Sequence, residues 1–303
     1  HSLGVIKKRN VNPDQWDALR IDERIEVERK IILEVDGVAA TSEIIKNSLV
    51  KDYQYLAEPL FLPPCVDPER YYPREIPQDH PVWGFLSQHC GLSPNEILRN
   101  QIITEISRTD QTKRKDVLIK AFAKIHQKHP NTLLVISIEQ RKEGLPKILM
   151  NLIDDLGLGK SIAVLGSVWD ELPDIYAVTD IFCTPSVMEG FGMTSQEAAA
   201  TSVPVIASNL VPFVTEYLLG DNIKDVSVEG SSVPLHLGQG GIVAQADDVN
   251  AFAQALDLLL SNKELRRKLG ENAYRITIPY FTWENVVIKF LQNVEIITQK
   301  KAH

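Results

Sequence analysis

The chain has 303 residues, of which 44% are hydrophobic and 24% charged, so it is long enough for two globular domains of ordinary composition. Its net charge of -8 argues against a general binder of nucleic acids or anionic membranes. Three scattered cysteines exclude a disulfide framework or a zinc ribbon, and no apolar run approaches the roughly 20 residues of a membrane helix. No signal peptide is visible, so we expect a cytoplasmic protein without integral membrane contact.

The chain begins at His1 rather than at a methionine, and no element is predicted close to that start. We therefore expect a segment cut from a longer protein, or one whose beginning has been lost. Over residues 12–35, apolar side chains recur at helical intervals among many charges, which predicts one or two amphipathic helices.

A short strand and a capped helix are predicted next. Residues 38–42 read as a small buried strand, and Ser42 can cap a helix over 43–50. Residues 60–66 read as extended chain. The prolines that follow permit neither strand nor helix, so residues 68–81 read as a linker.

Strands and helices alternate regularly after the linker. The predicted strands are 102–107, 133–138, 162–168, 181–185, 203–207 and 241–244, and the predicted helices are 115–127, 145–156, 172–177, 193–202, 213–219, 248–260 and 263–273. The strands are apolar on both faces, which predicts a parallel sheet covered by helices on two sides, as in a Rossmann-type domain. A last amphipathic helix is predicted over 283–299.

The stretch 181–202, IFCTPSVMEGFGMTSQEAAATS, is a strand, a glycine loop and a helix. This order places backbone N–H groups and the positive end of a helix against an anion. Gly190 and Gly192 allow the main chain to approach a ligand, although most loops of this kind are ordinary turns. Glu189, at the start of the loop, can accept hydrogen bonds from sugar hydroxyls.

Arg108 and Lys113 follow the first strand of the second domain, at the edge where parallel sheets bind ligands. With a helix starting near Thr112, three consecutive cations crowd its positive end, which the helix dipole disfavours. A bound polyanion would reverse that penalty, whereas a solvated basic turn is the ordinary alternative. The second anion-compatible loop in the same sheet favours the polyanion.

Glu197 has two interpretations. Thr194-Ser195-Gln196-Glu197 fits a capping box, in which Glu197 would bond the Thr194 N–H, and on spacing alone this is the favoured one. The alternative is a carboxylate that receives ligand hydroxyls. The sequence contains neither an Asp-x-Asp triplet nor a P-loop motif. This argues against a site that binds a nucleotide sugar through a metal ion and against a P-loop nucleotide site.

Together these residues resemble family 4 glycosyltransferases. Ile106-Ser107-Arg108, followed by Lys113 and VLIKAF, is similar to that family's donor-site entry, and Glu189 with Glu197 matches its E-x7-E motif. SVPVIAS and GGIVAQADDVNAFAQAL resemble its later strands. The segments His1-Ser2-Leu3-Gly4 and PPCVDPERYYP resemble the end of the acceptor domain in the sucrose-phosphate synthase branch. The resemblance covers nearly the whole chain.

The resemblance implies an α/β GT-B fold, in which two Rossmann-like domains face each other across a cleft. Residues 1–80 would be the closing part of the N-terminal acceptor-side domain with its linker. Residues 81–275 would be the complete nucleotide-sugar donor domain, and 276–303 a helix crossing back to the first domain. The implied reaction is retaining transfer of a hexosyl group from a UDP-, ADP- or GDP-sugar to a sugar, sugar phosphate or small polyol, without metal or cofactor.

The same resemblance implies a role for each motif residue. Arg108 and Lys113 would neutralise the diphosphate leaving group. Glu189, with the main-chain amides of the residues after it, would hold the donor sugar and phosphate (Gly190, Phe191, Gly192, Met193 and Thr194). Glu197 would accept the ribose hydroxyls, and His1 would line the reaction centre.

Two departures leave specificity open. Cys65 stands where the family commonly has glycine, and Val211-Pro212-Phe213 replaces its usual Gly-Gly-Pro, so the preferred base and sugar are not predicted. The acceptor and the oligomeric state also stay open. The main alternative function is a truncated, non-catalytic nucleotide-sugar-binding remnant. A Rossmann oxidoreductase is much weaker, because no Gly-x-Gly-x-x-Gly follows a strand.

Overall fold

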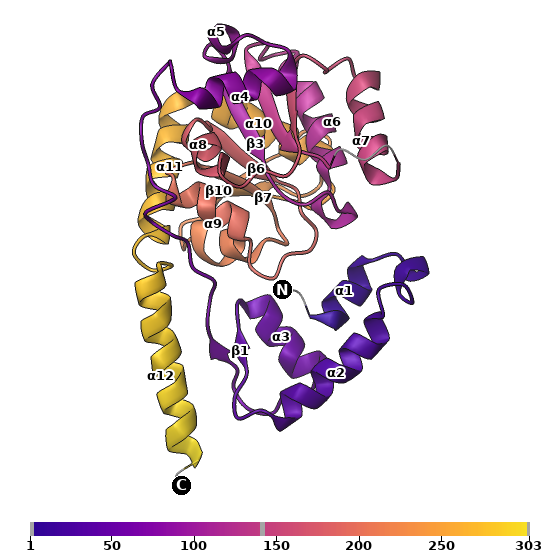
Figure 1. Cartoon of the computed structure of the whole chain (residues 1–303), viewed down its shortest axis with the longest axis vertical. Helices are drawn as coiled ribbons and strands as arrows, with labels where there is room; N and C mark the ends of the chain where they lie inside the picture. Colours follow the sequence, from indigo (N-terminus) through magenta and orange to yellow (C-terminus); the bar gives the residue numbers. More distant parts are fainter. Residues whose placement is uncertain (1–2, 140–142, 302–303) are drawn as a thin grey trace.

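The computed structural model describes residues 3–139 and 143–301, and an eight-stranded sheet is its centre (Figure 1). The strand order is β5-β4-β3-β6-β7-β10-β9-β8. The first six of these strands run parallel, with the bounds β5 (Ile162–Leu165), β4 (Thr132–Ser137), β3 (Gln101–Glu105), β6 (Ile181–Thr184), β7 (Val205–Ser208) and β10 (Gly241–Ala244). The predicted parallel sheet is therefore confirmed.

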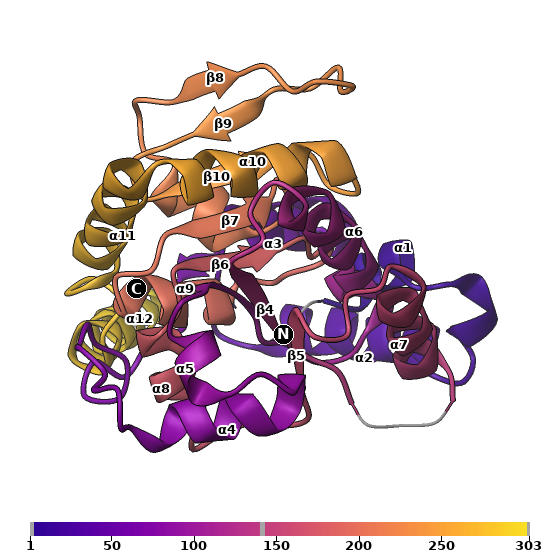
Figure 2. The same ribbon diagram turned by 90° about the horizontal axis from the view of Figure 1, so that it is seen from above.

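Both faces of this sheet are buried. Along β4, Leu133 and Val135 belong to one hydrophobic core, whereas Leu134 and Ile136 belong to the other. The first core is covered by α4 (Pro81–Cys90), α5 (Pro94–Ile97), α8 (Leu172–Ala177), α9 (Met193–Ala200) and η3 (Val214–Leu218). The second is covered by α6 (Lys115–His126), α7 (Leu145–Asp155) and α10 (Val249–Ser261), and α11 (Lys263–Thr277) reaches both. Figure 2 shows α4 and α10 on opposite sides of the strands.

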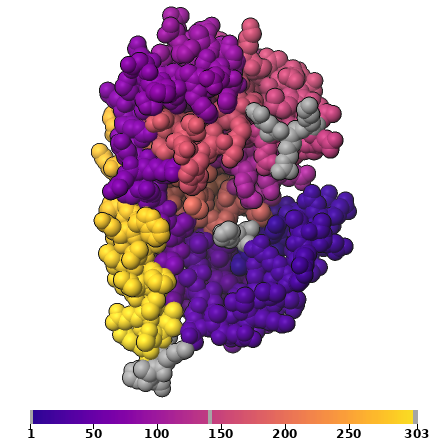
Figure 3. All heavy atoms as spheres, in the orientation of Figure 1, coloured from indigo at the N-terminus to yellow at the C-terminus, as the bar shows by residue number. Residues whose placement is uncertain are grey.

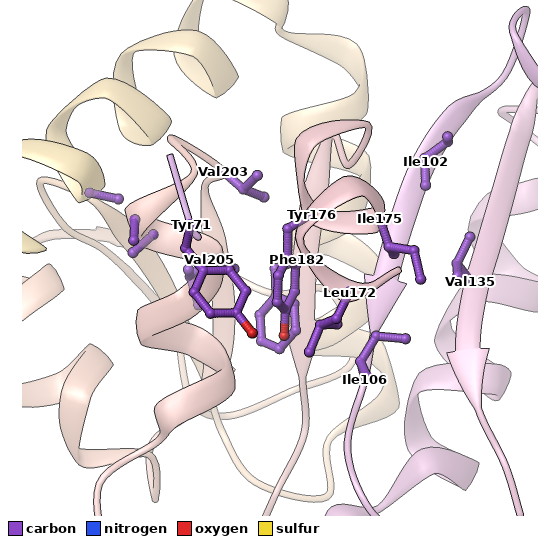
Figure 4. Packing of buried hydrophobic residues seen from close by; sticks show 14 of the residues in the cluster. Tyr71, Ile102, Ile106, Val135, Leu172, Ile175, Tyr176, Phe182, Val203 and Val205 are labelled. Carbon is purple, nitrogen blue, oxygen red and sulfur yellow. The ribbon is translucent and has the colours of Figure 1, made fainter. Parts of the chain in front are cut away.

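The chain before α4 packs onto the first of these cores. The Tyr71 ring lies 5.9 Å from that of Tyr176 in α8, and Tyr176 lies 5.9 Å from Phe182 in β6 (Figure 4). Tyr176 is fully buried. The proline-rich segment thus lies in extended form on the domain of the eight-stranded sheet, and it contains neither helix nor strand over 67–80.

The structure contains elements that the sequence did not predict. A helix, α1 (Gly4–Asn10), starts close to the beginning of the chain, where no element was expected, and Ile6 is buried there against the second helix. Pro81 is the first residue of α4, a position where proline needs no amide hydrogen. β8 (Lys224–Val226) and β9 (Leu235–Leu237) add an antiparallel hairpin at the sheet edge.

The N-terminal part is a smaller unit below the sheet (Figure 1). After α1 it contains η1 (Pro13–Gln15), α2 (Ile21–Glu34), β1 (Ala39–Ala40), α3 (Glu43–Asp52) and β2 (Leu60–Phe61). β1 and β2 pair in parallel, and the Ser42 hydroxyl caps α3 as predicted. The final helix, α12 (Trp283–Lys301), returns to this part, where the Asn293 amide donates to the Phe61 carbonyl at 3.2 Å. Within residues 3–139 and 143–301, no helix combines the length and apolar character that crossing a bilayer requires.

Two helical glycines test how tightly the domain of the eight-stranded sheet is packed. A Cβ at Gly270 in α11 would lie 2.1 Å from the Ser202 carbonyl oxygen, whereas a Cβ at Gly84 in α4 would meet no atom within 4 Å. We expect Gly270→Ala to lower the free energy of unfolding by about 2 kcal/mol through overpacking. Gly84→Ala should leave it unchanged or raise it by up to about 1 kcal/mol through helix propensity. Urea denaturation measures both, and equal stabilities would contradict the close contact.

Candidate functional site

The candidate site lies where two adjacent strands end. β3 and β6 are neighbours in the sheet, so the loops that follow them leave the same edge side by side. The Thr112 carbonyl of the first loop accepts the Val187 N–H at 2.8 Å and the Ser186 hydroxyl at 3.2 Å from the second. The β3–α6 and β6–α9 loops are thus held together by hydrogen bonds to one main-chain carbonyl.

Lys113 and Glu189 meet between these loops. The Lys113 ammonium donates a hydrogen bond to the Glu189 carboxylate, and the two side chains are only 10% and 16% exposed. Two of the residues singled out in the sequence, 76 positions apart, therefore form one charged pair.

The turn that presents Lys113 is shaped locally. Asp110 accepts the Thr112 N–H at 2.8 Å and starts a 3₁₀ turn, η2 (Gln111–Lys113). Burial alone would raise the pKa of Asp110, but the hydrogen bonds from Thr112 hold it below its usual value. Arg114 then takes the left-handed conformation, and α6 begins only at Lys115. The expectation that three cations crowd the helix start is wrong, because only Lys115 lies in its first turn.

Arg108 lines a cleft whose lining does not include Lys113. Arg108 is exposed, and the cleft, of about 720 Å³, lies between the domain of the eight-stranded sheet and the N-terminal part. The opposite wall includes Lys7 of α1 and Arg24 of α2, and Met188 of the β6–α9 loop also lines the space. Figure 3 shows the surface hollowed between the indigo N-terminal part and the domain above it. Each wall of the cleft thus carries cationic side chains, although Asp110 lies beside Arg108 and Arg24 pairs with Glu28.

The glycine loop is fixed by its neighbours. Gly192 has φ 112° and precedes α9, and a Cβ there would lie 2.7 Å from the Val211 side chain. The Gly190 carbonyl accepts the hydroxyls of Thr41 at 3.0 Å and Ser42 at 2.9 Å, both from the N-terminal part. The loop thus contacts both halves of the structure.

The remaining loop residues divide between core and surface. The Phe191 side chain is buried among Phe213, Tyr217 and Phe281, so only its main chain could reach a ligand. Met193 is exposed at the start of α9. The first amides of a helix lack acceptors within the helix, so Met193 and Thr194 present N–H groups at this end.

Glu197 does not form the capping box. α9 begins at Met193 with Gly192 as its N-cap and has no side-chain cap, so Glu197 lies in the second turn. Its carboxylate instead accepts the Tyr176 hydroxyl at 3.4 Å. Burial raises the pKa of Glu197 to about 7, while the Tyr176 hydrogen bond and the Arg70 charge oppose that rise. Sequence reasoning missed Tyr176 and Arg70, since an aromatic residue in a helix and an arginine in a linker carry no distinguishing signal.

His1 lies outside the described residues. Within residues 3–139 and 143–301, no group of three or more histidine, cysteine or acidic side chains is arranged to hold a metal ion. The structure therefore brings Lys113 and Glu189 into contact, lines the cleft with Arg108, and places the carboxylate of Glu197 against the buried Tyr176.

The raised pKa of Glu197 predicts a pH dependence of stability. Below pH 4.5 the carboxyl is protonated in both states, but between pH 4.5 and about 7 only the unfolded chain releases the proton. The free energy of unfolding should therefore fall as pH rises through this window, by up to about 3 kcal/mol. Glu197→Gln should lack this component, whereas Glu197→Asp should retain a pH-dependent one. Denaturation of the three proteins at pH 4.5, 6 and 8 measures it, and parallel profiles would contradict the burial of this carboxyl.

Comparison with known proteins supports the fold and the family. The family described as "Glycosyl transferases group 1" matches residues 94–276, more than half of the chain. Mannosylfructose-phosphate synthase from Agrobacterium fabrum is 30% identical over 222 residues, which are 69% of this chain and 47% of that protein.

Solved structures of other proteins superpose on most of this chain and show the same fold. A sucrose-phosphate synthase from Thermosynechococcus elongatus superposes with a TM-score of 0.76 at 23% identity, covering 99% of this chain and 67% of that one. Anabaena HepE in complex with UDP and glucose superposes with a TM-score of 0.70 at 19% identity, covering 91% and 67%. The chain thus spans about half of the curated relative and two thirds of each structure, and it belongs to the group 1 (family 4) glycosyltransferases of GT-B fold.

Proposed function

We propose that the β3–α6 and β6–α9 loops form the donor site of a retaining hexosyltransferase that uses a nucleoside diphosphate sugar. The observation that carries this proposal is the Lys113–Glu189 contact, with Arg108 on the adjoining cleft. Glu189 offsets one positive charge of this group, so the three side chains together are cationic. A diphosphate bound beside these side chains would neutralise their remaining positive charge.

The proposed roles of Lys113 and Arg108 follow from the negative charge that develops on the leaving diphosphate. When the bond from the sugar to the diphosphate breaks, negative charge grows on the leaving phosphate oxygens. Fixed cations in a partly water-excluded site stabilise that charge more than water does. Lys113 is held in place by Glu189 before any ligand arrives, so it needs little reorganisation. Arg108 would supply the second contact from the cleft.

Glu197 would hold the nucleoside end of the donor. A carboxylate accepts hydrogen bonds from the two ribose hydroxyls, and these bonds favour its ionised form. Glu189 and the amides from Gly190 to Thr194 would hold the sugar and the adjoining phosphate. His1 would line the reaction centre.

The acceptor would enter from the opposite wall of the cleft. Lys7 lines that wall beside Arg24, which pairs with Glu28, and the Lys7 charge favours an acceptor that carries a phosphate over a neutral sugar or polyol. The name of the mannosylfructose-phosphate synthase relative fits such an acceptor.

Calorimetry with UDP, ADP and GDP tests the donor site. We expect one of the three to bind with a micromolar to millimolar dissociation constant, and UDP comes first because it occupies the HepE structure. Arg108→Gln should weaken that binding about tenfold through loss of one charge-assisted hydrogen bond. Because Arg108 is exposed, the variant should keep its thermal stability. Lys120→Gln, on the outer side of α6, is the matched control and should bind as the wild type. Absence of binding by all three nucleotides would refute the proposal.

An assay of sugar transfer distinguishes an active enzyme from a protein that only binds the nucleotide sugar. In a protein that transfers the sugar, we expect Lys113→Ala to abolish turnover, because the buried cation beside the leaving group is lost. The product's anomeric configuration, read by NMR, should match that of the donor. Turnover of Lys113→Ala at the wild-type rate would contradict the role of this lysine. Nucleotide binding by the wild type without transfer to any sugar phosphate would favour the non-catalytic remnant.

A further inference from the structure

A second charged pair lies beneath the Arg108 loop, and the proposed chemistry does not use it. Glu105, the last residue of β3, and Lys115, the first residue of α6, form an ion pair. Their side chains are 0% and 1% exposed, so neither reaches the cleft. A cation in the first turn of a helix also opposes the helix dipole. Both the burial and the position are unfavourable for a lysine unless the contacts compensate.

The contacts of this pair converge on Ser107. The Lys115 ammonium donates to the Ser107 carbonyl at 3.2 Å and lies 3.0 Å from its hydroxyl oxygen. The Ser107 hydroxyl donates in turn to Glu105 at 2.5 Å. From the neighbouring strand, Ser137 donates its hydroxyl to the Ser107 carbonyl at 2.5 Å and accepts the Ser107 N–H at 3.0 Å. The main-chain N–H, the carbonyl and the side chain of Ser107 are therefore all fixed.

Ser107 is the residue immediately before Arg108. Once its N–H and carbonyl are fixed, the direction in which the chain enters Arg108 is fixed as well. Lys115 also sits two residues after Lys113, so the same pair anchors the far end of the short loop that carries both proposed diphosphate ligands.

We propose that Glu105 and Lys115 are positioning residues for the diphosphate site, which hold the β3–α6 loop so that Arg108 projects into the cleft. This inference rests on the proposed donor site. Stability alone explains the pair poorly, since buried ion pairs can often be replaced by apolar residues without loss of stability. Apolar side chains, however, cannot donate to the Ser107 carbonyl. An effect of the ion pair on the β3–α6 loop can therefore be measured separately from its effect on the stability of the fold.

The test is the double variant Glu105→Leu with Lys115→Met, which leaves the net charge unchanged. We expect its melting temperature to equal or exceed that of the wild type. Its affinity for the nucleoside diphosphate that the wild type binds should fall about tenfold, because Arg108 is misplaced. The affinity for the corresponding nucleoside should change less than about twofold, since Glu197 and the proposed ribose contacts belong to α9.

Ser137→Ala is a second, milder variant. It keeps the ion pair but removes two hydrogen bonds to Ser107, and it should weaken diphosphate binding by about threefold without changing nucleoside binding. It decides the question if the double variant does not fold. Lys120→Met, an exposed lysine on the same helix, controls for loss of a nearby charge.

Unchanged diphosphate affinity in both variants would overturn the inference. An equal loss of diphosphate and nucleoside affinity would also overturn it, because the pair would then support the whole domain rather than the Arg108 loop. If the wild type itself binds no nucleoside diphosphate, the proposed donor site fails, and that result is read from the wild type before any variant is made.

Discussion

The contact between the Lys113 ammonium and the Glu189 carboxylate is the interaction on which the candidate site depends. It joins two loops far apart in sequence, and it exists because β3 and β6 are adjacent in a parallel sheet. Both side chains are largely buried, and a buried charge without its partner is costly, so each residue constrains the other. The hydrogen bonds from Val187 and Ser186 to the Thr112 carbonyl add a second link. These three hydrogen bonds therefore join the two loops at this edge of the sheet.

Each loop also turns into its helix through a left-handed residue. At Gly192 the conformation is free of steric cost, and the close Val211 side chain leaves no room for anything larger than glycine. Arg114 takes the same conformation without being glycine, at a cost of about 1 kcal/mol. Its guanidinium binds Asp116 and Asp247, which offsets that cost. The two helices thus begin only after these residues, at Lys115 and Met193.

The sequence was sufficient for the sheet and for the meeting of the two loops, because apolar strands and the residues that follow them are local signals. It failed where the exact helix boundary decides the outcome. Glu197 could complete a capping box only if Thr194 were the N-cap of α9, but the N-cap is Gly192. The β8–β9 hairpin has three-residue strands without clear alternation. Lys115 was one of three cations for which a solvated basic turn was the alternative, and Glu105 was not singled out; only their tertiary pairing reveals that they are buried.

Hydrogen bonds link the N-terminal part to the glycine loop between β6 and α9. Thr41 and Ser42, just before α3, donate their hydroxyls to the Gly190 carbonyl, and the Glu43 N–H donates to the Glu216 carboxylate at 3.1 Å. The start of α3 is therefore seated on the loop proposed to hold the donor. Any movement of α3 away from this loop would have to break these hydrogen bonds. The position of α3 and the conformation of the glycine loop are thus linked through the Gly190 carbonyl.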